Sequence, residues 1–400
     1  MKRLVVCIIA GDLDPDDLGG AEVHIVEVSR RLAERGHEVH LFVGNDDRIS
    51  RIFKEKKLYI HPIHYPRLPN LASLLYMRYA EKAVEDFLRD HHVDILHAKQ
   101  VFPFGTICTR LKSRNNIPVY VTVQNPYAYL EELVLNVPLL GRYAGSLIQR
   151  SLLPFVRNAI SHADIVAAVS TYSQKGCLEL GAKATTIVPN GVDTTQFARR
   201  ATRREGINGQ FHIVSTSTLI PRNGLEVLIE SIALLTAEGI DVRVTLAGDG
   251  PLEHELKTLA QELGVSDVVE FIGTIPHNEV PKLLARSDIF VRPSIAEGFG
   301  VSFIEAMAVG VPVVTCPSGG IIDFVKNRRT GMLVPAGDPP RLRDAILELV
   351  HDNALYVRIV DTAWDMIRST YDWETITESV EHAYWSLMGN NHCRDGDLEP

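Results

Sequence analysis

Two glutamates eight residues apart are the side chains whose spacing most suggests chemistry. They lie in EGFGVSFIEAMAVGVPVV, residues 297–314, where Glu297 precedes a Gly-Phe-Gly turn and Glu305 falls inside an apolar segment. A carboxylate that points into a protein interior loses hydration unless a polar partner compensates for it. The pattern therefore predicts that a polar group meets both acids.

The turn between the two glutamates is suited to an anion. Gly298 and Gly300 let the backbone approach a ligand closely and expose its N–H groups. The helix expected from Val301 to its end at Gly310 directs the positive end of its dipole at the same place, which favours phosphate. Carboxylates beside it would accept hydrogen bonds from hydroxyls, and a nucleotide sugar offers two sets, on its ribose and on its hexose. The alternative is that Glu305 only satisfies backbone or arginine groups in the core.

Alternating strand and helix patterns predict the elements that position this stretch. Buried runs that do not alternate polar with apolar residues, joined by segments of helical periodicity, favour parallel sheets covered on both faces. In such sheets ligands lie outside the carboxyl ends of the strands. The predicted strands are 3–10, 37–44, 94–98, 119–124, 164–170, 211–219, 242–248, 268–273, 288–294 and 311–316. The predicted helices include 21–36, 224–239, 251–264, 278–287 and pieces near 340–350 and 354–369.

Length and pattern both divide the chain into two domains. A chain of 400 residues is too long for one hydrophobic core, and the alternation restarts after IVPNGVDTTQF (187–197), which a proline and an Asn-Gly turn punctuate. We predict an α/β protein with two Rossmann-like doubly wound domains, 1–190 and 191–370. A helix at 371–388 carries an apolar stripe that predicts packing back on the first domain, and the tail 389–400 is polar.

Composition argues against several classes of protein. No run approaches eighteen apolar residues, so no membrane-spanning helix is predicted, and neither half is basic enough to predict nucleic-acid binding. Five scattered cysteines without metal-ligand spacing favour a reduced, cytoplasmic compartment and no metal cluster. Residues 1–200 hold 25 Lys and Arg against 21 Asp and Glu, and residues 201–400 hold 16 against 29. This asymmetry indicates an anionic partner for the first half, or a chance distribution of solvated charge.

The sequence resembles the retaining glycosyltransferases of family 4, which have the GT-B fold of two Rossmann-like domains facing a cleft. The resemblance covers nearly the whole chain, and the pair of glutamates with its surroundings is its most specific part. It is carried by LGGAEVHIVEVSRRLAERGHEV (18–39), VPNGVD (188–193), LAGDGPLEHEL (246–256), FIGTIP (271–276), PSIAEGFGVSFIEAMAVGVPVV (293–314) and YDWETI (371–376).

The resemblance implies transfer of a sugar from a nucleoside diphosphate to an acceptor hydroxyl, with the anomeric configuration kept. It implies that Glu297 contacts the donor sugar and that Glu305 holds the ribose. The loop with Gly19 and Gly20 would lie by the phosphates and the acceptor. Main-chain contacts with the donor are expected at Gly298, Phe299 and Gly300. The further residues expected to bind the donor are Thr218, Asn223, Gly248 and Gly250. Helix dipole and loop amides would stabilise the leaving diphosphate, so neither a metal nor a cofactor beyond the sugar donor is expected.

Several positions depart from the family pattern. The loop after the first strand of the second domain usually holds an Arg and a Lys that neutralise the diphosphate, and Thr218 and Asn223 occupy these positions here. Arg222 is either the cation that compensates or a solvated surface residue. Gln124 and Lys99 stand where histidines are common. Gln124 can keep a hydrogen bond but cannot carry charge, whereas Lys99 either supplies positive charge to the cleft or lies on the surface.

Two functions remain open at this point. The first is a retaining, metal-independent glycosyltransferase with Glu297 and Gln124 in the catalytic role, which the intact glutamate pair favours. The second is a non-catalytic or atypical-donor GT-B protein that binds a nucleotide or sugar, or partners an active glycosyltransferase, which the missing cations favour. A nicotinamide-dependent dehydrogenase would need G-x-G-x-x-G after a strand, and GDGPLEH supplies only two glycines. His97, at the end of a buried strand, is predicted to be a satisfied core residue.

The acceptor is the partner that the sequence specifies least. The amphipathic stretch 129–160 and the basic cluster IFKEKKLYI (52–60) favour a lipid-linked or cell-surface glycan precursor, and with it a peripheral position at the inner face of a membrane. A buried pair of helices would give the same pattern in 129–160. The oligomeric state, a homo-oligomer included, stays open.

Overall fold

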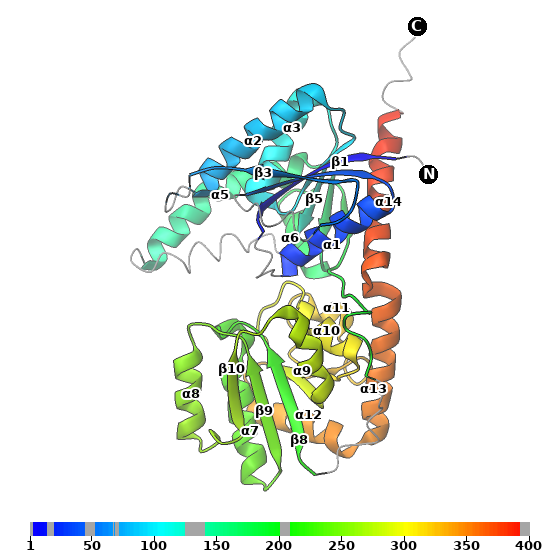
Figure 1. Cartoon of the computed structure of the whole chain (residues 1–400). Coiled ribbons are helices and arrows are strands. Elements are labelled where there is room, and N and C mark those ends of the chain that lie inside the picture. The colour runs from blue at the N-terminus through cyan, green and yellow to red at the C-terminus, as the bar shows by residue number, and fades with distance from the viewer. Residues whose placement is uncertain are drawn as a thin grey trace. The chain divides into compact units, whose positions relative to one another are not determined.

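The computed structural model describes residues 3–13, 20–44, 53–66, 68, 72–124, 141–200 and 209–392, without the side chains of 21, 141–150 and 390–392. It consists of two units, one formed by residues 1–190 with 373–400 and the other by residues 191–372. Each unit holds one parallel sheet with helices packed on it (Figure 1). None of the described helices combines the length and the apolar character needed to cross a membrane.

The sheet of the first unit has seven parallel strands in the order β3-β2-β1-β4-β5-β6-β7. Five of them are the predicted strands. The edge strands β3 and β7 were not predicted, because β3 contains a proline and β7 has only three residues. The strands are β1 (Val5–Asp12), β2 (Glu38–Gly44), β3 (Leu58–Ile63), β4 (Ile95–Ala98), β5 (Val119–Val123), β6 (Ile165–Ala168) and β7 (Thr185–Ile187). The helices are α1 (Gly20–Glu34), α2 (Ala72–Asp90), η2 (Val101–Gly105), α3 (Thr106–Asn115), α5 (Gly141–His162), α6 (Thr171–Glu179) and α14 (Trp373–His392).

Successive residues of β1 belong to two separate cores, because the side chains of a strand alternate between the faces of its sheet. Cys7 and Ile9 join the core under α2, α3 and α5, whereas Val6 and Ile8 join the core under α1 and α14. Figure 1 shows α14 beside α1, and Arg35, which follows α1, forms ion pairs with three glutamates of α14. The C-terminal helix is thus part of the first unit's core.

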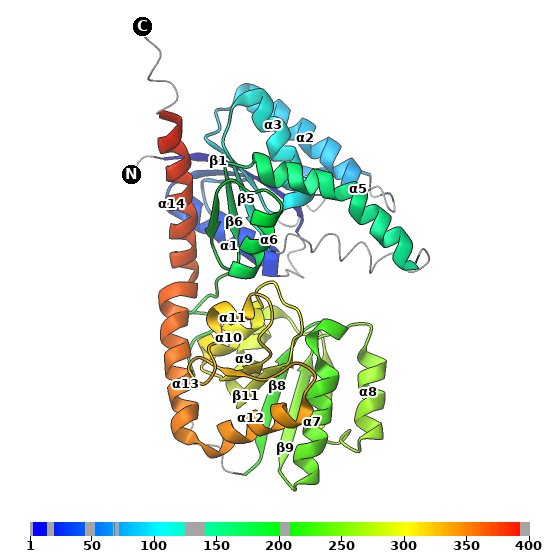
Figure 2. The same ribbon diagram turned by 180° about the vertical axis from the view of Figure 1, so that it is seen from behind.

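The sheet of the second unit has six parallel strands in the order β10-β9-β8-β11-β12-β13. Its core joins these strands to α7, α8, α12 and α13, and α7 packs beside α12 (Figure 2). The two-residue edge strand β13 was not predicted. The strands are β8 (Phe211–Thr216), β9 (Val242–Ala247), β10 (Val269–Gly273), β11 (Ile289–Arg292), β12 (Val313–Thr315) and β13 (Met332–Leu333). The helices are η3 (Pro221–Asn223), α7 (Leu225–Ala237), α8 (Glu253–Glu262), η4 (His277–Glu279), α9 (Val280–Arg286), α10 (Val301–Val309), α11 (Ile321–Phe324), α12 (Pro339–His351), α13 (Asn353–Met366) and η5 (Ile367–Tyr371).

The order of strands reverses direction once in each sheet. In the second unit the chain runs from β8 through β9 to β10 at one edge, and then from β11 through β12 to β13 at the other. The reversal falls between β8 and β11, and the equivalent reversal of the first unit falls between β1 and β4. Ligands of open parallel sheets bind outside the carboxyl ends of the strands at such a switch point. A ligand is therefore expected at the carboxyl ends of β8 and β11 or of β1 and β4.

Candidate functional site

The stretch with the two glutamates forms the turn after β11 and the whole of α10, as predicted. Gly300 caps the helix with φ of 91°, and a Cβ on it would lie 2.6 Å from Cδ2 of Phe303, so the turn requires glycine. Phe299 is buried, with its ring centroid 5.3 Å from that of Phe324. Because its side chain belongs to the core, the backbone of Phe299 is the part suited to contact a ligand. Gly310 ends the helix, as expected from the sequence.

Neighbouring backbone holds Glu297 in place. Its carbonyl oxygen accepts a hydrogen bond of 3.0 Å from the N–H of Gly320, in the loop after β12. Gly319 has φ of 51°, and a Cβ there would fall 1.7 Å from the same oxygen, so no side chain fits. One carboxylate oxygen, Oε1, accepts from the N–H of Gly298 over 3.1 Å. Glu297 is therefore fixed at both its backbone and its carboxylate.

A buried arginine that we did not predict as a site residue contacts Glu297. Arg292 is the last residue of β11 and is 6% exposed, and its Nη2 donates to Oε2 of Glu297 over 2.7 Å. Its Nη1 donates to Oγ of Ser302 over 2.8 Å, and its Cζ lies 4.3 Å from the ring centre of Phe303. The sequence carried a signal for it, because a lone arginine ends the otherwise apolar strand IFVR.

Arg222 adds a second positive charge close to the first. It is exposed, and its carbonyl accepts a hydrogen bond of 2.8 Å from the N–H of Ile295, which ties the loop after β8 to the loop after β11. Burial is the main cause that lowers the pKa of Arg292; the Glu297 carboxylate opposes this effect and the charge of Arg222 adds to it. Two guanidinium groups within electrostatic reach at a switch point favour an anionic ligand.

Glu305 lies one turn into α10 and is 6% exposed. Its Oε1 is 2.7 Å from Nε2 of His277, the first residue of η4, which follows β10. The imidazole is half-exposed, so this contact does not match the alternative that Glu305 serves only backbone and arginine groups of the core. His277 was not predicted as a site residue, since only the fold brings η4 beside α10.

Four of the predicted donor-binding residues shape the loop after β8 or pack against it. Asn223 is buried, and its Nδ2 donates to the carbonyl of the exposed Thr218 over 2.7 Å, which closes the loop. A Cβ on Gly248 or Gly250 would lie 2.0 or 2.5 Å from a carbonyl oxygen of that loop. The two glycines thus let the turn after β9 pack directly on the loop that carries Thr218.

Lys99 lies at the switch point of the first sheet. Its N–H donates to the carbonyl of Ile9 over 3.0 Å, which places it between the ends of β1 and β4. It is 4% exposed and its ammonium pairs with Glu22 in the first turn of α1, so the alternative of a surface lysine is wrong. Gly20 is the exposed first residue of α1, whereas Gly19 lies outside the described residues.

The Lys99–Glu22 pair gives a testable prediction. Glu22→Gln is expected to lower the free energy of unfolding by about 2 kcal/mol, because it leaves a buried ammonium without its counter-charge. The 27% exposure of the Glu22 side chain keeps this value below that of a fully buried pair. Urea denaturation measures it, with Glu85→Gln as the control because Glu85 and Arg114 form an exposed pair. Equal stability of the two variants would contradict the prediction.

Gln124 follows β5 and binds the side chain of Asn190. Its Nε2 donates to Oδ1 of Asn190 over 2.9 Å, and Nδ2 of Asn190 donates to Oε1 of Gln124 over 2.7 Å. The same Oδ1 lies 3.0 Å from Nδ1 of His24, which packs edge-on against Trp373 with ring centroids 5.6 Å apart. Both polar atoms of Gln124 are thus engaged by the last residue of the unit's first segment, and its catalytic role stays a prediction.

His97 is a satisfied core residue, as predicted. Its Nε2 lies 2.8 Å from Oγ1 of Thr122 and its Nδ1 lies 2.7 Å from the hydroxyl of Tyr384 on α14. Burial lowers the pKa of His97 to about 3. In the same unit, burial lowers the pKa of two further buried histidines, His24 and His40, to about 4.

These buried histidines predict sensitivity to mild acid. Their pKa values are lower in the folded chain than the ordinary 6.5, so only the unfolded chain binds protons between pH 6.5 and about 4, and stability falls as pH drops through that window. Each group contributes up to roughly 1.4 kcal/mol per pH unit there. Urea midpoints at pH 7.5 and 5 test this for the wild type and for His97→Gln, which should lose less stability. An identical loss in both would contradict it.

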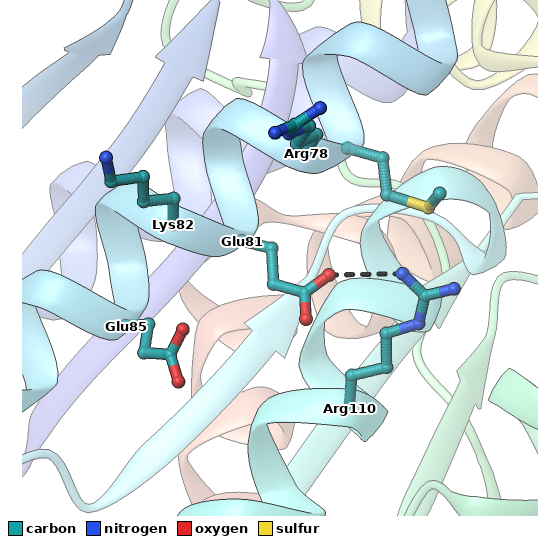
Figure 3. A pocket seen from close by; sticks show the side chains of 6 residues that line it. Arg78, Glu81, Lys82, Glu85 and Arg110 are labelled. Carbon is teal, nitrogen blue, oxygen red and sulfur yellow. Dashed lines mark hydrogen bonds and ion pairs between the residues drawn. The ribbon is translucent and has the colours of Figure 1, made fainter.

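A groove of ≈ 280 Å³ lies between α2 and α3 and is lined by residues of these two helices. Figure 3 shows Arg110 of α3 pointing at Glu81 of α2, and these two side chains form an ion pair of 3.1 Å. Arg114 reaches Glu81 and Glu85 over 3.1 and 3.2 Å. Because the carboxylates of this groove are already paired and its lining residues all belong to helices, it does not match the strand-end sites at which open parallel sheets bind ligands. Within the described ranges, no group of three His, Cys, Asp or Glu side chains could hold a metal ion.

Two parallel α/β units, each with one switch point, form the GT-B fold that the sequence predicts. Residues 18–196 match the family described as Glycosyltransferase Family 4, and residues 199–366 match the family described as Glycosyl transferases group 1. The chain belongs to the family 4 glycosyltransferases.

Relatives of known name align over almost the whole chain. The gpi3 subunit of phosphatidylinositol N-acetylglucosaminyltransferase from Schizosaccharomyces pombe is 24% identical over 384 residues, with 94% of this chain and 79% of the relative covered. The N-acetyl-alpha-D-glucosaminyl L-malate synthase of Bacillus anthracis is 26% identical over 383 residues, with 93% and 95% covered. The structure of HepE of Anabaena in complex with UDP-glucose is similar with a TM-score of 0.74 at 19% identity, over 96% of this chain and 100% of the other.

Proposed function

We propose that this glycosyltransferase moves a sugar from a nucleoside diphosphate to an acceptor hydroxyl and keeps the anomeric configuration. The observation that carries the proposal is the pair of carboxylates, Glu297 and Glu305, on either side of the amino end of α10 at the switch point of the second sheet. Oxygen atoms of both acids can accept hydrogen bonds from sugar hydroxyls.

The positions of the two carboxylates, one before α10 and one within it, would orient the nucleotide-sugar donor in one direction. Its diphosphate would lie on the backbone N–H groups from Phe299 to Val301, where the dipole of α10 favours negative charge. Glu305, deeper along the helix, would accept from the ribose hydroxyls, and Glu297, in the turn, from those of the transferred sugar. A structural neighbour solved with UDP-glucose and two relatives named for N-acetylglucosaminyl groups support UDP-glucose and UDP-N-acetylglucosamine as first donors to test.

The reaction needs charge stabilisation more than a protein base. The bond between the anomeric carbon and the phosphate oxygen breaks, the acceptor oxygen bonds to that carbon, and the acceptor proton passes to the departing phosphate. Negative charge grows on the diphosphate as the sugar becomes oxocarbenium-like, and preorganised amides at the helix terminus stabilise it. Arg222 adds positive charge at the same strand ends, whereas the charge of Arg292 is paired with that of Glu297. We therefore propose a reaction that requires no metal.

We propose a lipid-linked or cell-surface glycan precursor as acceptor, bound by the first unit of a cytoplasmic protein at the inner face of a membrane. A relative named for phosphatidylinositol supports a lipid, whereas one named for L-malate supports a small acceptor. The predicted amphipathic stretch lies outside the described residues up to 140, and the described Arg157 of α5 is exposed. Transfer to lipid-bearing and soluble acceptors, compared side by side, separates the two.

A second candidate is a non-catalytic subunit that partners an active glycosyltransferase. The amide pair of Gln124 with Asn190 and the neutral residues Thr218 and Asn223 favour it, and one relative is by name a subunit. A panel of UDP- and GDP-sugars with and without EDTA tests both candidates, using Glu297→Ala as the control. Turnover with α-product from an α-donor, by NMR, supports the transferase. Nucleotide binding without turnover of any donor supports the subunit.

A further inference from the structure

Arg292 is buried at the switch point of the second sheet and joins three segments there. Its Nη1 reaches the carbonyl of Thr216, at the end of β8, over 3.4 Å. Its Nε donates to Oγ of Ser294 in the turn over 3.1 Å, and its Nη1 to Oγ of Ser302 in the first turn of α10 over 2.8 Å. The planar guanidinium thus fixes the strand end, the turn and the helix relative to one another.

Packing alone does not account for a charge at this position. The three residues before Arg292 in β11 are apolar and buried, and a buried ion pair is often no more stabilising than apolar side chains of similar volume. A lysine would supply the charge but could not form the planar fork that meets Glu297, Ser294 and Ser302 together. The geometry of the contacts, rather than charge alone, is therefore the property that distinguishes this residue.

The ion pair with Arg292 leaves the carboxylate of Glu297 able to bind a ligand. Nη2 of Arg292 donates one hydrogen bond to Oε2 of Glu297, and the N–H of Gly298 donates one to Oε1. A carboxylate offers about four lone-pair sites, so each oxygen keeps an acceptor position for a hydroxyl. The carboxylate is held in one orientation and remains 20% exposed. This arrangement is expected of a carboxylate that must point at its ligand in a fixed direction.

We propose that Arg292 is a positioning residue that acts through Glu297, holding its carboxylate in the direction that meets the donor sugar. The inference rests on the proposed function. It assigns a role to a residue at the strand end, in a chain whose neighbouring loop has Thr218 and Asn223 in place of cations. Misdirection of a positioned group lowers the rate of the bound complex more than it weakens binding.

A double-mutant cycle tests the inference in the full-length enzyme. Arg292→Lys is expected to lower kcat for sugar transfer about 10-fold, with Kd for UDP or GDP within about threefold of wild type. In a Glu297→Gln background the same substitution should change kcat by less than about threefold, because the carboxylate it orients is gone. Additive losses would overturn the inference, since they would show that the arginine acts independently of Glu297.

Arg200→Lys is the matched control for a purely structural arginine. Arg200 donates to the carbonyls of Ser287 and Gly310 over 2.9 and 3.0 Å, at the opposite ends of β11 and α10. The Arg200→Lys substitution should lower the midpoint of thermal unfolding and leave kcat unchanged. If Arg292→Lys behaves like this control, the inference is wrong.

Ser302→Ala keeps the inference testable if Arg292→Lys does not fold, because it releases one arm of the guanidinium without leaving a charge unpaired. It should lower kcat about threefold at unchanged nucleotide affinity, and an unchanged kcat would contradict the inference. A wild-type protein that turns over no donor would instead overturn the proposed function, and this inference with it.

Discussion

Glu297→Gln is expected to lower kcat for sugar transfer by about 100- to 1,000-fold, with the affinity for the nucleoside diphosphate within about threefold of wild type. The proposed contact of Glu297 is with the transferred sugar, where charge develops as the bond to the diphosphate breaks. The amide of glutamine keeps the shape of the side chain and removes the negative charge. Steady-state kinetics with the sugar donor measure the first effect, and titration calorimetry with UDP and GDP measures the second.

Glu270→Gln is the control for this experiment. Glu270 is an exposed glutamate on β10 of the same sheet and pairs with Arg243 over 2.6 Å. Its replacement should leave kcat and nucleotide affinity unchanged. A Glu297→Gln enzyme with wild-type kcat, or one that has lost nucleotide affinity, would show that the carboxylate does not face the sugar.

Glu305→Ala should give the opposite pattern, a loss of about 30- to 100-fold in affinity for the nucleoside diphosphate itself. The proposed hydrogen bonds join this carboxylate to the ribose, and hydrogen bonds to charged groups contribute roughly 1.5–3 kcal/mol each. His277→Ala should cost less, about threefold, because the imidazole only orients the carboxylate across their 2.7 Å contact. Calorimetry with UDP and GDP, without any sugar, measures both.

The two glutamate variants together separate the two ends of the donor. A nucleotide lacking the ribose hydroxyls should bind the wild type and Glu305→Ala with nearly equal affinity. Wild-type affinity of Glu305→Ala for UDP and GDP would place the ribose elsewhere. Thermal unfolding of the variant checks that α10 still forms, which we expect because the partner left behind, His277, is half-exposed.

Local signals in the sequence were sufficient for most central elements and for both ends of α10. The buried run FHIVSTSTL predicted a strand where β8 spans Phe211–Thr216, and the glycines 300 and 310 bracket the helix as expected. Such signals depend on neighbouring residues only. Edge strands carry weaker ones, because β3 includes Pro62 and β13 is two residues long, and their pairing is decided by the adjacent strand.

The partners of the site residues could not be predicted in the same way. The carboxylates Glu297 and Glu305 were identified from their spacing, but Arg292 and His277 became site residues only when the fold brought β11 and η4 to α10. The surface alternative for Lys99 is wrong for a similar reason. Its partner, Glu22, is 77 residues away, and the approach of β4 to α1 buries the lysine.

A crystal structure with the nucleoside diphosphate of the active donor tests the central claim most directly. The account predicts phosphate oxygens within about 3 Å of the backbone N–H groups from Phe299 to Val301, and ribose hydroxyls at a similar distance from the carboxylate of Glu305. Phosphate bound away from the amino end of α10, or a ribose that does not touch Glu305, would contradict it.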